Sequence, residues 1–222
     1  MATCSPTSSG NWSSVSWSCS HVPTTADDVF LSPFVSINLT LDGSVTVNSI
    51  VVGSSSTLNL GSYTLTLTST TKPFDIYSSI GGTGTIKLIG DADIEISGGC
   101  QSAAHTIPNL IMGPITAPRT VTLGHTSCEA IFQVNGNFIS GSSASAMVSF
   151  AKGHANSNIT NSVTSYWCAS NGGITNIDCQ AGAPPATPPP ISASVESDLA
   201  FALTFLGIVL IAAFKLRKAR KA

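Results

Sequence analysis

The chain has 222 residues, of which 9% are charged and 42% hydrophobic, and Ser, Thr and Gly make up much of the remainder. The low charge content excludes disorder driven by self-repulsion, and the abundance of Thr, Val and Ile over Glu, Lys and Arg favours strands over helices. Five of the nine cations lie in the last eight residues, so the chain ahead of them has four cations against eleven acids, a net charge of −7. A nucleic-acid-binding face is therefore excluded, because it needs Lys and Arg spread over a docking surface.

Residues 1–28 place two of the three Trp residues, Trp12 and Trp17, between Cys4 and Cys19. The coils predicted below for residues 29–180 leave an apolar end without a neighbour, and such ends must be capped. We interpret residues 1–28 as a disulfide-closed cap in which the two Trp rings cover that end. The alternative role for these rings is an aromatic platform that stacks on a sugar.

Apolar residues alternate with polar ones from Val35 to Thr70, which is typical of strands with one buried face. The breaks at Asp42-Gly43, Gly53-Ser54 and Gly61-Ser62 make the strands short. The same pattern returns over residues 82–99 and 119–150. This repeated alternation predicts an all-β fold. The predicted architecture is a short β-helix over residues 29–180, with about six or seven coils of roughly 20–25 residues each. A two-sheet β-sandwich is the alternative, because its turns have similar spacing. The alternating apolar residues are Val35, Ile37, Leu39, Leu41, Val45, Val47, Leu58, Leu60, Leu65 and Leu67.

Three acidic residues, Asp91, Asp93 and Glu95, alternate along one predicted strand and therefore project from one face. Leu88, Ala92, Ile94 and Ile96 take the inner positions, which leaves the acids outside. Outward carboxylates of this kind can bind Ca²⁺ or act as acid and base in polysaccharide cleavage. The simpler interpretation, which we prefer, is a solvated charged face with no cofactor.

The six cysteines allow three disulfides and lack the paired spacing of zinc or redox motifs. Among fifteen connectivities we favour nearest-neighbour pairing, 4–19, 100–128 and 168–179. Disulfides indicate an oxidising compartment outside the cytoplasm. The four histidines show no metal-binding spacing, so we expect them on the surface or in loops. The cysteines are Cys4, Cys19, Cys100, Cys128, Cys168 and Cys179, and the histidines are His21, His105, His125 and His154.

The opening of the chain resembles exported bacterial surface proteins that have right-handed β-helix bodies. The matching residues are Gly10-Asn11-Trp12-Ser13, Trp17, Val22-Pro23 and Asp27-Asp28-Val29, and the later Ile107-to-Gly113 stretch is similar to their coils. The resemblance covers roughly residues 4–150. It implies a right-handed coil, a cell-surface location and an adhesive or structural role.

The C-terminal part is predicted to hold the chain in a membrane. Residues 181–198 form a Pro-rich linker that reads as a stiff spacer, and residues 199–214 are sixteen residues without a charge, just short of a typical transmembrane helix. The basic tail over residues 215–222 is expected to stay in the cytoplasm and to leave the body outside. Its cations are Lys215, Arg217, Lys218, Arg220 and Lys221.

This tail also resembles the sorting signals that exosortase-type membrane enzymes process. No Pro-Glu-Pro precedes the apolar stretch, however. We therefore prefer a plain membrane anchor. Residues 1–30 contain neither the basic start nor the apolar run of a signal peptide. We therefore expect the printed sequence to be a mature or shortened form, or one with a misassigned start.

The sequence predicts a membrane-anchored, non-enzymatic protein of the cell envelope, with an adhesive or structural role and a glycan or surface protein as partner. One alternative is a polysaccharide-processing enzyme or Ca²⁺-dependent glycan binder that uses Asp91, Asp93 and Glu95. The other is a viral attachment or spike protein, because a short β-helix on a basic-tipped anchor suits a virion that buds through a membrane.

Overall fold

The computed structural model describes residues 1–98, 104–125, 127, 129–143, 146–161 and 172–173. The chain divides into two compact units, Met1–Pro184 and Pro185–Ala222. The second unit lies outside the described residues, as do the predicted linker over residues 181–198, the predicted membrane helix over residues 199–214 and the basic tail. Within the described residues, no helix has the length and apolar character needed to cross a membrane.

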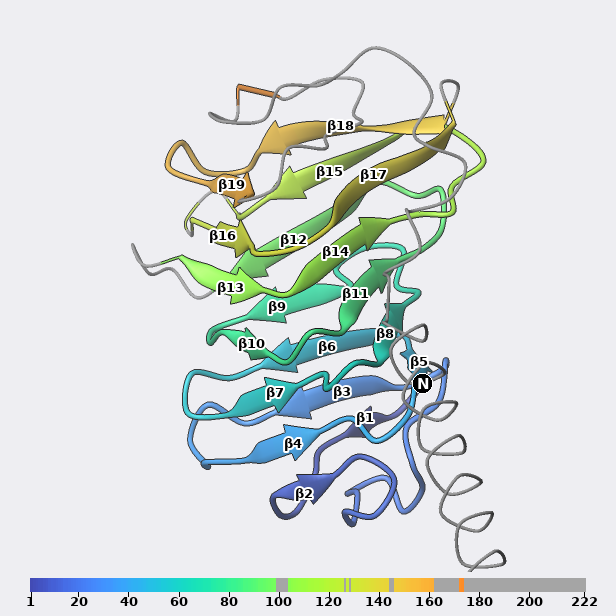
Figure 1. Ribbon diagram of the computed structural model, residues 1–222, viewed down its shortest axis with the longest axis vertical. Helices are drawn as coiled ribbons and strands as arrows, with labels where there is room; N and C mark the ends of the chain where they lie inside the picture. Colours follow the sequence, from blue (N-terminus) through green and yellow to red (C-terminus); the bar gives the residue numbers. More distant parts are fainter. Residues whose placement is uncertain (99–103, 126, 128, 144–145, 162–171, 174–222) are drawn as a thin grey trace, which may run out of the picture. The chain divides into compact units, whose positions relative to one another are not determined.

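The described part is a parallel β-solenoid of about six turns (Figure 1). Each of the five middle turns contributes one short strand to each of three faces, whereas the first and last described turns contribute strands to two faces only. Strands of successive turns pair in parallel along a face. Face 1 consists of β1 (Thr3–Cys4), β3 (Asp28–Leu31), β6 (Ser49–Val52), β9 (Phe74–Ile76), β12 (Ile94–Gly98), β15 (Arg119–Leu123) and β18 (Ala146–Lys152). Parallel pairing between turns confirms the predicted solenoid and rules out the β-sandwich, whose sheets are antiparallel.

The two other faces are built in the same way from the strands that follow in each turn. Face 2 consists of β2 (Gly10–Asn11), β4 (Asn38–Thr40), β7 (Thr57–Asn59) and β10 (Ile80–Gly81), followed by the separate sheet of β13 (His105–Ile107), β16 (Ile131–Val134) and β19 (Asn158–Asn161). Face 3 consists of β5 (Val45–Val47), β8 (Thr64–Leu67), β11 (Thr85–Leu88), β14 (Asn109–Met112) and β17 (Phe138–Ser143). An antiparallel pairing of β17 with β18 joins faces 1 and 3 into one 12-stranded sheet.

The core is a set of apolar ladders that run from turn to turn. On face 1, Ile50 is in register with Phe74, and Phe74 with Ile96. On face 3 the corresponding ladder joins Leu65 to Ile86. All of these side chains are fully buried. Each ladder residue is buried only because the turns above and below cover it, so burial of apolar area between turns supplies the main stabilisation.

The turns lengthen toward the C-terminal end of the described solenoid. On face 3 the Thr64 N–H donates to Ser44 Oγ, 20 residues earlier in the chain, whereas the Asn137 N–H donates to Asn109 Oδ1, 28 residues earlier. The predicted range of 20–25 residues therefore fits the turns in the middle of the solenoid and is too short for the last ones. It is also too short for the first step on face 2, where Gly10 is in register with Leu39, 29 residues later. Extra residues enter at the connections between strands, because the strands themselves must keep their register with the turn before.

One turn of the solenoid depends on a glycine for close approach. A Cβ atom at Gly84 would lie 2.2 Å from the Tyr63 carbonyl oxygen of the preceding turn. No side chain fits there without a shift of backbone. Gly84 is followed at once by β11, so the missing side chain lets that strand stack directly on β8.

Candidate functional site

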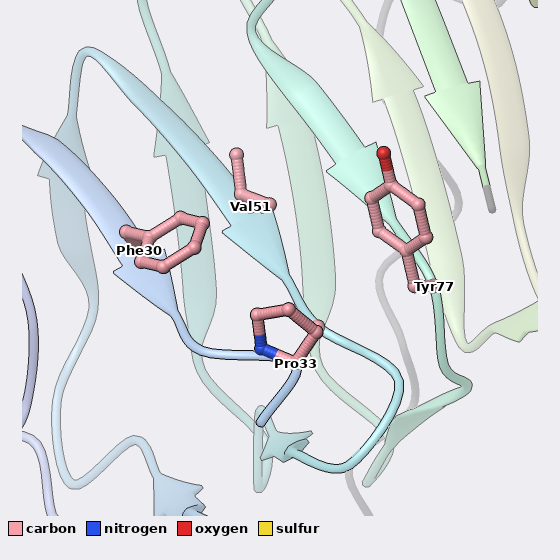
Figure 2. A pocket seen from close by; sticks show the side chains of 5 residues that line it. Phe30, Pro33, Val51 and Tyr77 are labelled. Carbon is pink, nitrogen blue, oxygen red and sulfur yellow. The ribbon is translucent and has the colours of Figure 1, made fainter. Parts of the chain in front are cut away.

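A small apolar hollow lies on the outer side of face 1, and Figure 2 shows the side chains around it. Phe30, Val51 and Tyr77 come from or follow the successive strands β3, β6 and β9, and Pro33 comes from the connection after β3. The hollow holds about 210 Å³ and is open to solvent on one side. Sites for drug-sized ligands usually hold about 300–1,000 Å³, so this hollow fits a single ring or side chain.

Register and a glycine explain why the hollow forms here. Phe30 is in register with Val51, and Val51 with Asp75, so these three outward positions form one row across face 1. Gly53 lies two residues after Val51, just past the end of β6, and a Cβ atom there would be 2.4 Å from the Pro33 backbone nitrogen. The connection after β3 therefore rests directly on the backbone after β6, and the space between Phe30 and Tyr77 stays unfilled.

A cluster of charged residues borders the hollow at Tyr77. Lys72 Nζ lies 2.9 Å from Asp75 Oδ2 and 3.7 Å from Glu95 Oε1, and Glu95 belongs to the next turn. The Tyr77 hydroxyl donates to Asp75 Oδ2 at 3.4 Å. Asp75 is 7% exposed, and its Oδ1 has no hydrogen-bond partner among the described residues. Lys72 therefore links two turns through its contacts with Asp75 and Glu95, and Asp75 Oδ1 remains a buried acceptor without a partner among the described residues.

Lys72 and Tyr77 have shifted pKa values in this cluster. Burial alone would lower the pKa of Lys72, but its hydrogen bond and ion pair with Asp75, together with the charge of Glu95, outweigh burial and raise the pKa. Burial raises the pKa of Tyr77, and the neighbouring Asp75 carboxylate raises it further. At neutral pH the border of the hollow therefore presents a protonated lysine and a neutral phenol.

Two large apolar residues next to the hollow are exposed. Phe34, in the connection that follows Pro33, is 93% exposed, and Val35 is 55% exposed. Val35 was expected on the inner side of a strand, and that expectation is wrong, because β4 begins only at Asn38. Exposed apolar side chains that cluster at one place are typical of binding surfaces.

The structure places Asp91, Asp93 and Glu95 differently from the sequence prediction. Only Glu95 lies within β12, Asp93 lies immediately before it, and Asp91 is in the preceding bend. Ile94 and Ile96, on either side of Glu95, are buried, as predicted. Glu95 faces Lys72 and accepts a hydrogen bond from Ser97, so it belongs to the cluster at the hollow.

Asp91 and Asp93 accept hydrogen bonds from the turn that follows. The Thr116 and Ala117 backbone N–H groups and the Thr116 hydroxyl donate to Asp91, and the Thr120 N–H donates to Asp93. These bonds lower the pKa of Asp91. Both carboxylates therefore tie one turn to the next, which differs from the open calcium site considered from the sequence.

Arg119 completes this junction between turns. It is 3% exposed, and its guanidinium donates to the Gly90 and Leu88 carbonyl oxygens at 2.7 and 3.1 Å. Burial lowers its pKa, while the charges of Asp91 and Asp93 oppose that change. Its role is structural, because it satisfies carbonyl groups where the chain turns from face 3 to face 1.

The N-terminal segment forms the first turn of the solenoid. β1 pairs with β3, and β2 pairs with β4, so residues 1–28 continue the sheets. Trp12 and Trp17 are 1% and 6% exposed, their ring centroids are 4.9 Å apart, and Trp17 Nε1 donates to the Trp12 carbonyl oxygen. This burial agrees with the cap interpretation and leaves neither ring free to stack on a sugar.

The predicted bridge between Cys4 and Cys19 is present, with the two Cα atoms 5.0 Å apart. Together with His21, these cysteines form the only group of three metal-ligand residues within the described residues whose donor atoms lie within 4.8 Å of one another. The disulfide occupies both sulfur atoms, so the group does not offer thiolates to a metal. The other cysteines, Cys100, Cys128, Cys168 and Cys179, lie outside the described residues, and their predicted pairing stays a prediction.

His21 and Asp27 hold the end of the cap. His21 Nε2 lies 2.9 Å from Asp27 Oδ2, and the buried Asp27 also accepts hydrogen bonds from the Thr24 N–H and hydroxyl and from the Ala2 N–H. The hydrogen bond with Asp27 raises the pKa of His21, and the same bond, followed by those from Thr24, lowers the pKa of Asp27.

This pair predicts a pH window for cap stability. The Asp27 contribution is present above its unfolded pKa of 3.8 and is lost as pH falls through its lower folded pKa. The His21 contribution is present below its unfolded pKa of 6.5 and is lost as pH rises through its higher folded pKa. We expect the difference in melting temperature between the parent chain and H21N to be largest between pH 3.8 and 6.5 and to decrease as pH rises through the raised pKa of His21, as measured by Trp fluorescence. A difference that stays constant with pH would contradict this assignment.

One histidine contradicts the expectation that all four lie on the surface or in loops. His105 is in β13 and is 6% exposed, and its Nε2 has no hydrogen-bond partner among the described residues. Burial lowers its pKa, so the ring is neutral at physiological pH. Its alternation with the buried Ile107 places it on the inner side of the strand, where it acts as a core residue.

Apart from Glu95, the residues of the hollow and its border carry no functional signal in the sequence alone. Lys72 and Asp75 are three residues apart, which would have indicated a local ion pair, but nothing in that spacing points to Glu95. The row from Phe30 to Asp75 exists only once three turns are aligned in register.

Comparison of the chain with protein-family models, with curated proteins and with solved structures finds no match.

Proposed function

We propose that this protein is a non-enzymatic adhesive protein of the cell surface, and that the outer side of β3, β6 and β9 is its binding face. The observation that carries this proposal is the apolar hollow between Phe30 and Tyr77, with the exposed Phe34 beside it. Aromatic side chains are enriched at the centres of protein interfaces, and here Phe30 lies on a hydrogen-bonded strand with Phe34 in the connection after it. Rigidity lowers the entropic cost of binding.

The location is part of the proposal. A disulfide in the first turn supports an oxidising compartment, and the sequence resemblance to exported bacterial proteins with right-handed coils supports display on an envelope. In this proposal residues 199–214 span the membrane and the basic residues from Lys215 onward stay inside. Protease added to intact cells should remove the solenoid and leave a C-terminal fragment. Full protection of the solenoid would contradict this topology.

Adhesion itself is tested with cells that display the full chain and with cells that display the double variant F30S/Y77S. Parent cells should attach to other cells or to surfaces coated with glycans or proteins, and the double variant should lose more than about 90% of that attachment, because two walls of the hollow are removed. The matched control is Y63S, since Tyr63 is also an exposed tyrosine but lies outside the hollow, next to β8 of face 3. Equal attachment by parent and F30S/Y77S would contradict the proposed binding face.

The cluster at the border of the hollow favours one second function, the processing of a polysaccharide. Lys72 lies between the carboxylates of Asp75 and Glu95, and acids with a basic partner are the groups that β-helix polysaccharide-cleaving enzymes use. Release of new reducing ends from a polysaccharide panel, abolished by E95Q and unchanged by E129Q, would support this function over simple adhesion.

A further inference from the structure

We propose that the occupant of the hollow is a second copy of this chain, with Phe34 of each copy inserted into the hollow of the other. The inference rests on the binding face proposed above and identifies its partner. The structure places a projecting aromatic side chain and a matching hollow next to each other on one face. A twofold axis between them would make both contacts at once.

Phe34 is the side chain that projects from this face. Phe34 is 93% exposed, while every other Phe among the residues with described side chains is at most 36% exposed. Its neighbours Pro33 and Phe30 line the hollow, so the projection and the hollow belong to one continuous apolar surface. Exposing a phenylalanine costs transfer free energy in a monomer, and insertion into an apolar hollow recovers it.

The chemistry of the hollow favours an apolar side chain over a sugar. Four of the five lining residues, Phe30, Pro33, Val51 and Gly53, have no polar side-chain atom. The fifth, Tyr77, already donates its hydroxyl to Asp75. A sugar ring in this hollow would bury hydroxyl groups against Phe30, Pro33 and Val51, whose side chains offer no hydrogen-bond partner, which is costly. A phenyl ring brings no such groups and packs well against Phe30 and Tyr77.

Self-association through this face follows the rules of twofold symmetry. In a twofold interface residue i of one copy contacts residue j of the other, and the reverse contact forms as well. Phe34 and the lining residue Pro33 are adjacent in the chain, so the two symmetric contacts lie next to the axis and form together. A dimer of one parent chain and one chain without the Phe34 side chain therefore keeps one of the two contacts. A dimer of two chains without that side chain keeps neither.

The charge of the chain predicts the salt dependence. The chain ahead of its last eight residues has a net charge of −7, so two copies repel each other at low ionic strength. Added salt screens this repulsion and should strengthen the association. A basic partner protein would show the opposite behaviour, because salt would screen an attraction.

The test is the association of the full chain in detergent, measured by sedimentation velocity at several protein and salt concentrations. We expect a monomer–dimer equilibrium that salt strengthens, and we expect F34A to raise the dissociation constant more than about tenfold. V51W, which fills the hollow and keeps Phe34, should have a similar effect. A mixture of F34A and V51W should associate more tightly than either variant alone, because it restores one complete contact.

Controls separate this interface from other routes of association. Y63A, on face 3, should leave the dissociation constant unchanged. Association through the predicted membrane helix would not respond to F34A, and that result would overturn the inference. A chain that stays monomeric at every salt concentration would overturn it too.

A cell-mixing experiment distinguishes failure of this inference from failure of the proposed function. Displaying cells labelled in one colour are mixed with non-displaying cells labelled in another. Clusters that contain displaying cells alone support pairing between copies. If displaying cells recruit non-displaying cells, and F34A does not weaken that recruitment, the inference is overturned but the adhesive function is not. If displaying cells neither cluster nor attach to any surface, both are contradicted.

Discussion

Replacement of Trp12 by alanine is expected to lower the free energy of unfolding by about 3–5 kcal/mol. Trp12 is 1% exposed and packs against Trp17 in the first turn, where no further turn of the described residues covers the apolar ladders. Its removal leaves a cavity and uncovers the end of the stack. In a solenoid the loss of a terminal cap also weakens the turns next to it, because stability depends on contacts between neighbours.

Urea unfolding of the full chain measures this change. F34A is the matched control at a concentration where the chain is monomeric, because Phe34 is 93% exposed and its removal should change the free energy of unfolding by less than about 0.5 kcal/mol. A W12A variant as stable as the parent would show that the ring does not act as a cap.

Removal of the Cys4–Cys19 bridge has the second largest expected effect. The bridge closes a loop with a sequence separation of 15, and the chain-entropy model gives about 3 kcal/mol for a loop of this length. The variant C4S/C19S is therefore expected to unfold at a markedly lower urea concentration than the parent. Cys4 is fully buried, and the new hydroxyl adds a small further cost there.

C4A/C19A separates the two contributions, because it removes the bridge without adding a buried hydroxyl. We expect C4A/C19A to keep most of the loss seen with C4S/C19S. The pH dependence assigned to His21 and Asp27 should persist in C4A/C19A only if the first turn stays folded, which Trp fluorescence reports. No loss of stability in either double variant would contradict a structural role for the bridge.

The proposed binding face, with a second copy of the chain as its partner, explains an exposed residue that the stability of the isolated chain does not explain. A highly exposed phenylalanine costs free energy in an isolated chain, and Phe34 lies beside an apolar hollow that a second copy could fill. F34A and F30S/Y77S therefore test function directly, because neither removes a residue from the interior ladders.

The alternation of apolar residues by itself determined that the chain forms short strands with one buried side, because side chains alternate across a strand whatever its partners are. Leu39, Leu58, Leu65 and Leu67 are fully buried, as this pattern predicts. The loose recurrence of similar phrases favoured the solenoid but left the β-sandwich open, and parallel pairing between turns decided between them. Nearest-neighbour spacing favoured the Cys4–Cys19 pairing among fifteen connectivities, and the structure confirms it.

Only the tertiary structure decided which outward side chains meet. Glu95 was grouped with Asp91 and Asp93 because the three alternate in the chain, yet it faces Lys72 of the preceding turn, while Asp91 and Asp93 bind the turn that follows. Val35 continues the alternation but lies exposed in a connection. The physical reason is register. Contacts on a face of a solenoid join residues about one turn apart, and the length of each turn depends on its connections, which local periodicity does not determine.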